Sequence, residues 1–409
     1  MTAAQYENYN FINFPKEELM PLTTAYGLAL DHYAAESWTD AIIYLELSLR
    51  LHRLLKDSVR YCVLHCNSSR HEEPILFKGN RDLRVYWHVM MGASCQKKCR
   101  AHFPALQLLP PGRQALEDFS RRSPYRYLYF AHSRLNDLQR AVPCAYTYLQ
   151  KNPGDQEMHR LIEEYKSQYD LSGYLTDHEE RPHEAPFLRG VKLIGSGDYS
   201  GGVEHMEEAL RLYLHEYDLC QADCEGISQL SPDTDFYTVI ADVYVEVLQC
   251  KLSCEENLRP NVGGYFVERL VAMIYHHLQY AYYKLNEGRS AVLCAHSYFL
   301  FEPEDQVMKH NLLYYEAYSE QWGLQPDHFT PRMEALKHFN QTVAQKQLLT
   351  FVEEYAKLDD EDFLGPEEAA RLASESPDVE FEGMGDYEES IYADWRQPKG
   401  KGDSGESNM

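Results

Sequence analysis

Small and apolar residues recur at helical spacing in two segments that lie 150 residues apart. The segment from Ala141 reads AVPCAYTYLQKNPGDQ, the segment from Ala291 reads AVLCAHSYFLFEPEDQ, and eight of the sixteen positions are identical. In the first segment Ala141, Ala145 and Tyr148 lie at i, i+4 and i+7, and Pro153 follows. Such residues share one face of a helix, and the proline ends it. Both segments therefore predict an amphipathic helix that packs closely against a neighbour.

The similarity extends far beyond these two helices. Residues 125–165 match residues 275–315 without a gap, and WTDAIIYLELSLR from Trp38 parallels YSGGVEHMEEALR from Tyr199. Small residues at helix crossings are typical of tetratricopeptide repeats. We therefore predict an all-α fold made of a tandem duplication, with units at 1–175 and 176–350. An unrelated amphipathic helical bundle is the alternative. Further small residues predict the neighbouring helices: Ala25, Ala41, Ala131 and Ala281.

Eight of the ten cysteines form four C-x3-C pairs. Two cysteines at i and i+4 lie on one face of a helix with parallel side chains, so they bond to a similar pair on an antiparallel neighbour better than to each other. The predicted disulfides are Cys62–Cys99, Cys66–Cys95, Cys220–Cys254 and Cys224–Cys250.

Two other interpretations of the cysteine pairs stay open, namely one four-cysteine zinc site in each unit or reduced cytosolic thiols. Structural zinc sites use C-x2-C more often than C-x3-C, which favours disulfides. The remaining cysteines, Cys144 and Cys294, sit beside the small crossing residues and are predicted to be buried thiols.

The charge is concentrated at the C-terminal end. The formal net charge is −25, and residues 353–394 hold sixteen acidic and two basic side chains. A surface this acidic argues against nucleic acid as a partner. Residues 351–409 are predicted to be a disordered acidic tail. Its aromatic residues form a candidate partner motif, with a merely solvating tail as the alternative: Phe381, Tyr387, Tyr392 and Trp395.

Three features of the sequence bear on the cellular compartment of the protein. No run of eighteen apolar residues exists, so we expect no membrane insertion, and the first residues lack the apolar core of a signal peptide. Paired cysteines favour an oxidising compartment. Two candidate glycosylation sites, Asn67 and Asn340, point the same way.

Motifs for catalysis are missing from the sequence. No His-x-Asp occurs among the eighteen histidines, and H-E-x-x-H, G-x-S-x-G and Walker A motifs are absent. We therefore predict no catalytic, cofactor-binding or metal-binding residues. The 32 tyrosines instead offer flat faces for packing between helices or for stacking on proline rings of an extended chain.

The segments QYENYNFINFPKEELMPL and NVGGYFVERLVAMIYHHLQYAYYKLNE, with the cysteine layout, resemble the leprecan family of prolyl 3-hydroxylases and non-enzymatic relatives. The ending FEGMGDYEESIYADW looks like one non-catalytic member in particular. From this resemblance we expect the iron- and 2-oxoglutarate-dependent domain of the family's enzymes to be absent.

The resemblance implies a function in the lumen of the endoplasmic reticulum. We expect a scaffold without cofactors that supports collagen modification, with prolyl 3-hydroxylase, lysyl hydroxylase, cyclophilin and procollagen as partners. The alternatives are a nuclear (synaptonemal) or cytosolic interaction scaffold and, more remotely, a hydroxylase.

Overall fold

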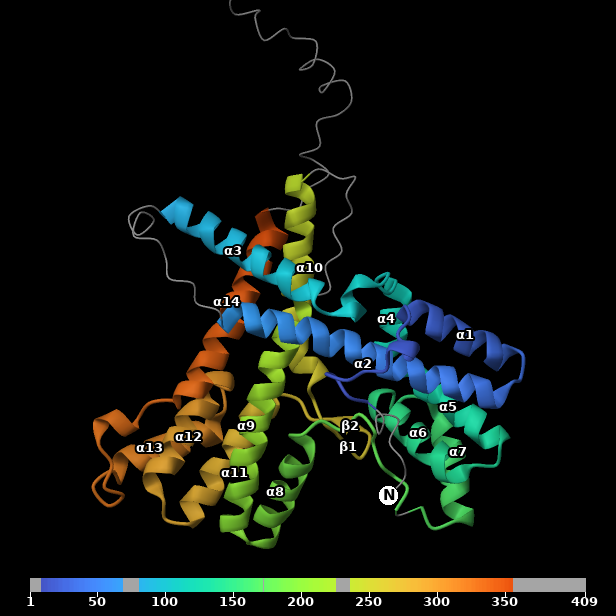
Figure 1. Ribbon diagram of the computed structural model, residues 1–409. Helices are drawn as coiled ribbons and strands as arrows, with labels where there is room; N and C mark the ends of the chain where they lie inside the picture. The colour runs from blue at the N-terminus through green and yellow to red at the C-terminus, as the bar shows by residue number, and fades with distance from the viewer. Residues whose placement is uncertain (1–8, 69–80, 172, 226–235, 356–409) are drawn as a thin grey trace, which may run out of the picture. The chain divides into compact units, whose positions relative to one another are not determined.

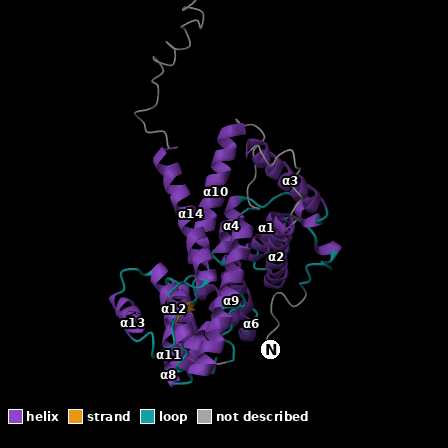
Figure 2. Ribbon diagram, turned by 90° about the vertical axis from the view of Figure 1, so that its left-hand side faces the viewer, coloured by secondary structure: helices purple, strands orange, loops and turns teal. Residues whose placement is uncertain are grey.

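The computed structural model describes residues 9–68, 81–171, 173–225 and 236–355, and Figure 2 shows that helices dominate this part of the chain. The predicted all-α class is confirmed. The strands β1 (Asn261–Val262) and β2 (Tyr265–Phe266) form a short antiparallel hairpin. The helices follow in chain order: α1 (Leu22–Ala34), α2 (Trp38–Ser68), α3 (Arg81–Ala101), α4 (Arg113–Ser120), α5 (Ser123–Arg134), α6 (Leu138–Lys151), α7 (Gln156–Gln168), α8 (Glu184–Ser196), α9 (Tyr199–Cys224), α10 (Phe236–Asn257), α11 (Leu270–Lys284), α12 (Gly288–Phe301), α13 (Gln306–Ala317) and α14 (Met333–Tyr355).

Four helical hairpins repeat across the two copies: α1–α2 and α5–α6 in the first, α8–α9 and α11–α12 in the second (Figure 1). Each connecting loop contains one residue with a positive φ angle, which reverses the chain within a few residues. These residues are Glu36, Asn136, Gly197 and Asn286. The following helix begins directly: Asp137 and Asp198 accept hydrogen bonds from the backbone N–H of Arg140 and Gly201.

The small residues lie where the helices cross, as the sequence predicts. Ala141 and Ala145 of α6 are fully buried, as are Ala291 and Ala295 of α12. The absence of a large side chain lets the paired helices approach closely. The tetratricopeptide-like packing is therefore confirmed.

Each copy contains its own hydrophobic core. Leu45, Leu128 and Met158 lie in the first core, and Met206 and Ile274 lie in the second. Several tyrosines are fully buried between helices, so they act as packing residues: Tyr125, Tyr129, Tyr213, Tyr275 and Tyr315. The boundary between the units at 175/176 stays a prediction.

The two copies contact each other through their longest paired helices, α2 and α9. Arg60 donates two hydrogen bonds to Asp223, at 2.9 and 2.8 Å, and Lys56 Nζ lies 3.3 Å from the same carboxylate. The side chains of Arg60 and Asp223 are only 18% and 13% exposed. This ion pair, which we call the inter-copy ion pair, joins residues 163 positions apart.

A second polar cluster occupies the segment that connects the copies. Arg122 donates to both oxygens of Asp177, at 3.1 and 3.0 Å, and to the carbonyl oxygen of Thr147 at 2.8 Å. Glu184 begins α8 beside this cluster. Its burial, with the negative charge of Asp177 as a smaller cause, raises the pKa of Glu184 to about 7. Folding therefore makes this carboxyl group bind its proton more tightly.

We predict that Glu184 makes the protein less stable as the pH rises from about 5 to 7.5. The folded-state pKa lies above the ordinary value of 4.5, so the stabilising contribution is complete below pH 4.5 and lost as the pH passes 7. Glu184→Gln should stabilise the protein more at pH 7.5 than at pH 5.5, with a difference on the order of 1 kcal/mol. Urea unfolding at both pH values measures it. The exposed Glu204→Gln is the control, and an equal effect of the two variants would contradict the prediction.

Residues 1–349 form one compact unit and residues 350–409 form a second. The helix α14 continues to Tyr355, five residues into the segment predicted to be a disordered tail. The reason is local, because no proline or glycine interrupts residues 350–355. The rest of the tail, with Phe381, Tyr387, Tyr392 and Trp395, lies outside the described residues. None of the described helices combines the length and hydrophobicity needed to cross a bilayer.

Candidate functional site

Two pairs of disulfides each join two neighbouring helices, and we call each pair a disulfide clamp. The first clamp, Cys62–Cys99 and Cys66–Cys95, joins α2 to α3. The second clamp, Cys220–Cys254 and Cys224–Cys250, joins α9 to α10. These bonds have the pairing that the i, i+4 spacing predicts. Since all eight sulfurs are bonded to each other, no thiolate among them is available to hold zinc.

The two clamps differ in burial. Cys224 and Cys254 are 2% and 0% exposed and belong to the core of the second copy. Their sulfur atoms lie 4.0 Å apart, so the two disulfides of this clamp touch. In the first clamp Cys62 is buried, whereas Cys66, Cys95 and Cys99 are half-buried. The first clamp is therefore closer to the molecular surface.

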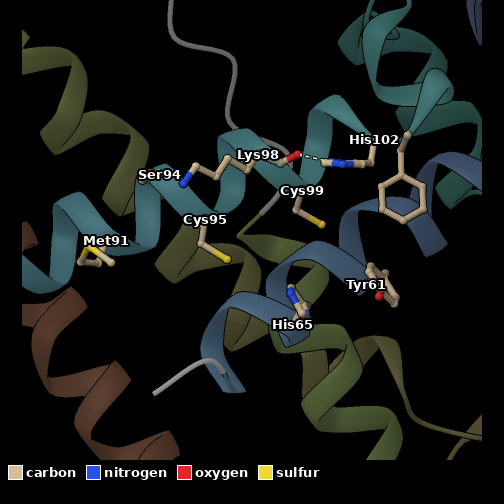
Figure 3. Close-up of a pocket in the computed structure, with 9 residues that line it drawn as sticks. Tyr61, His65, Met91, Ser94, Cys95, Lys98, Cys99 and His102 are labelled. Carbon is tan, nitrogen blue, oxygen red and sulfur yellow. Dashed lines mark hydrogen bonds between the residues drawn. The ribbon is translucent and has the colours of Figure 1, made fainter. Parts of the chain in front are cut away.

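A cavity of about 470 Å³ lies over the first clamp, between α2 and α3. Figure 3 shows that Cys95 and Cys99 point from α3 toward α2, with Tyr61 and His65 facing them from α2. The residues that line it are Tyr61, His65, Met91, Ser94, Cys95, Lys98, Cys99, His102 and Phe103. None of them is acidic, although the chain as a whole carries a net charge of −25.

Aromatic rings and basic groups give the cavity its chemistry. The ring centroid of Tyr61 lies 5.3 Å from that of Phe103 and 6.1 Å from that of Phe11. His102 Nδ1 lies 2.7 Å from the carbonyl oxygen of Lys98, so this ring is fixed beside the cavity. The arrangement suits an apolar or acidic side chain of a partner protein. Both lining cysteines are oxidised, so they offer no thiol nucleophile.

The buried titratable side chains serve packing. Burial lowers the pKa of four histidines to about 4, so they are neutral at physiological pH: His52, His132, His183 and His338. His183 Nε2 lies 3.0 Å from the carbonyl oxygen of Leu258. Burial also raises the pKa of Cys294 to about 12, which keeps this thiol protonated and weakly nucleophilic. Cys144 and Cys294 form no disulfide and are buried, as predicted.

The other predicted sites lie apart from the clamps. Asn340 is exposed on α14, and the backbone of Asn67 belongs to α2, but the side chain of Asn67 lies outside the described part of the structure. Glycosylation of either residue stays a prediction. Sequence reasoning missed the cavity, although one pattern indicates it: residues 83–116 contain five Lys or Arg and no Asp or Glu.

The chain matches the family model described as the leprecan family TPR-like repeat region over residues 21–319. The chain belongs to the leprecan family. The match includes both clamps and the cavity of this leprecan protein. Rat endoplasmic reticulum protein SC65 is 46% identical, with 99% of this chain and 95% of SC65 covered. Human cartilage-associated protein is 44% identical, with 88% and 90% covered. Rat prolyl 3-hydroxylase 2 is 32% identical over 73% of this chain but only 44% of its own length.

Proposed function

We propose that this leprecan protein is a non-enzymatic scaffold of the endoplasmic reticulum lumen. In this proposal it brings together collagen-modifying proteins, namely a prolyl 3-hydroxylase, a lysyl hydroxylase and a cyclophilin, and so supports the modification of procollagen. The observation that carries the proposal is the pair of disulfide-clamped helical repeats. A rigid repeat surface binds other proteins well, and disulfides persist in an oxidising compartment.

The names of the relatives support the compartment and the process. SC65 is named as an endoplasmic reticulum protein, another relative as cartilage-associated, and a third as a prolyl 3-hydroxylase. The non-enzymatic part of the proposal is supported by how the potential metal-ligating side chains are grouped. Among the described residues, three or more potential metal ligands meet only at Cys220, Cys224 and Cys254, which are in disulfides. An iron site of two histidines and one carboxylate needs a different grouping.

We expect the full chain, purified from the endoplasmic reticulum of expressing cells without reductant, to carry a prolyl or lysyl hydroxylase with it. The amount should fall severalfold when both clamps are removed, because the repeats then lose their rigid geometry. Mass spectrometry of the eluate measures this. A variant with Cys144 and Cys294 replaced by serine keeps the clamps and controls for cysteine loss. An eluate without any hydroxylase would contradict the scaffold function.

The rival function, a nuclear or cytosolic scaffold, is tested by measuring the intact mass of the protein after alkylation in denaturant without reductant. The proposed compartment predicts eight oxidised and two alkylated cysteines, since Cys144 and Cys294 are not in disulfides. A chain from cells with all ten cysteines alkylated would favour the rival.

A further inference from the structure

The solvent-facing side of α3 carries an exposed apolar row. Tyr86, Val89 and Met90 are 64%, 55% and 64% exposed and lie at i, i+3 and i+4, which places them on one face of the helix. Cys95 follows Tyr86 by nine residues, about two and a half helical turns, so it points the opposite way. Because the clamp fixes the cysteine side of α3 against α2, the apolar row faces away from the first copy. We call this row, with Lys97, the α3 outer face.

One basic side chain, Lys97, continues the apolar row. Lys97 follows Tyr86 by eleven residues, about three turns, and so lies on the same face of the helix. It is exposed, and no carboxylate of the described residues pairs with it. The one acidic residue of α3, Asp82, precedes the row at the N-terminal end of the helix, and no acidic residue occurs from 83 to 116. The C-terminal end of the α3 outer face is thus apolar and basic, on an acidic protein.

The duplication shows that the clamp itself does not require this chemistry. The cysteines of α3 and α10 correspond at an offset of 155, so Lys97 corresponds to Leu252 and Arg100 to Glu255. The second copy builds the same type of clamp without these basic residues. The clamp therefore does not require the positive charge of Lys97.

We propose that the α3 outer face binds an amphipathic helix of a partner protein whose apolar row is bordered by Asp or Glu. This inference rests on the proposed scaffold function and assigns a surface to it. A helix is the matching shape, because side-chain ridges along α3 fit the grooves of another helix. Methionine and tyrosine adapt well to such contacts. An anionic membrane surface is a less suitable partner for the α3 outer face than a helix, since the protein's net charge of −25 repels an anionic membrane.

The test measures binding of full-length prolyl 3-hydroxylase to the full chain and three variants. Tyr86→Asp with Met90→Asp should weaken binding about tenfold, because two charges enter an apolar contact. Lys97→Glu should weaken it about threefold at low salt and less at high salt. The control Val307→Asp changes a residue of α13 that is 66% exposed and should leave binding unchanged. A disulfide map of each variant shows whether the clamp has formed.

Each result decides between the proposals. If the unaltered chain binds the hydroxylase and the α3 variants bind equally well, the α3 outer face is not the docking surface, while the scaffold function survives. If the unaltered chain does not bind the prolyl 3-hydroxylase, this inference is overturned, whereas the scaffold function fails only if the eluate of the earlier experiment also contains no hydroxylase. Vesicles containing phosphatidylserine complete the test. Vesicle binding that is lost with Tyr86→Asp and Met90→Asp, with hydroxylase binding intact, would overturn the inference in favour of a membrane surface.

Discussion

Replacing Cys224 and Cys250 together with alanine is expected to lower the free energy of unfolding by about 4 kcal/mol. The bond spans a sequence separation of 26 residues, but Cys220–Cys254 stays closed in this variant and already restricts the same loop. The extra freedom of the unfolded chain therefore contributes about 2.5 kcal/mol, less than for an isolated bond. A further contribution of about 1–2 kcal/mol comes from packing, since Cys224 is 2% exposed within the second core. Urea unfolding under non-reducing conditions measures the change.

The first clamp provides a matched control for this prediction. Cys66–Cys95 closes a loop of similar size, with a separation of 29 residues, so the entropic contribution is nearly the same. Both of its cysteines are half-buried, and less packing is lost on replacement. Since Cys62–Cys99 also stays closed, the double alanine variant of the first clamp should be destabilised by only about 2.5 kcal/mol. Equal losses in the two variants would show that burial of the second clamp adds nothing.

The clamps were predictable because the cysteine spacing that determines them is local in the sequence and occurs twice. The i, i+4 spacing restricts how Cys62 and Cys66 can bond, and the same pattern at Cys220 and Cys224 repeats the restriction. The crossing positions Ala141 and Ala291 were predictable for the same reason. A small residue at a fixed interval from a tyrosine and a proline is a local pattern, and its second occurrence makes chance an unsatisfactory explanation.

The contacts between the copies were not predictable in this way. Arg60 and Asp223 are separated by 163 residues, and neither belongs to a sequence motif that predicts an ion pair. Both lie within stretches of mixed charge on long helices, where most charged side chains face water. Only the crossing of α2 and α9 selects this pair. The cavity over the first clamp depends on tertiary structure too, since Tyr61 and Lys98 meet only when the clamp has formed.

The inter-copy ion pair leads to the second large prediction. Asp223→Ala should destabilise the protein by about 2 kcal/mol, because the mostly buried Arg60, beside Lys56, loses its bidentate partner and keeps only the more distant Asp57, at 3.9 Å. Thermal unfolding at neutral pH, followed by circular dichroism, measures the loss. The loss should change little with salt, since a buried pair is screened less than an exposed one.

Glu208→Ala is the matched control, because it breaks another bidentate pair. Glu208 accepts hydrogen bonds of 2.8 and 2.7 Å from Arg211 one helical turn away, but these side chains are 46% and 65% exposed. An exposed pair within one helix contributes little, so this variant should unfold at nearly the same temperature as the unaltered chain. If Asp223→Ala proved equally mild, the ion pair would not hold the copies together. Other contacts between the copies, such as the hydrogen bond that Asn261 Nδ2 donates to the carbonyl oxygen of Gln150, would then have to account for their association.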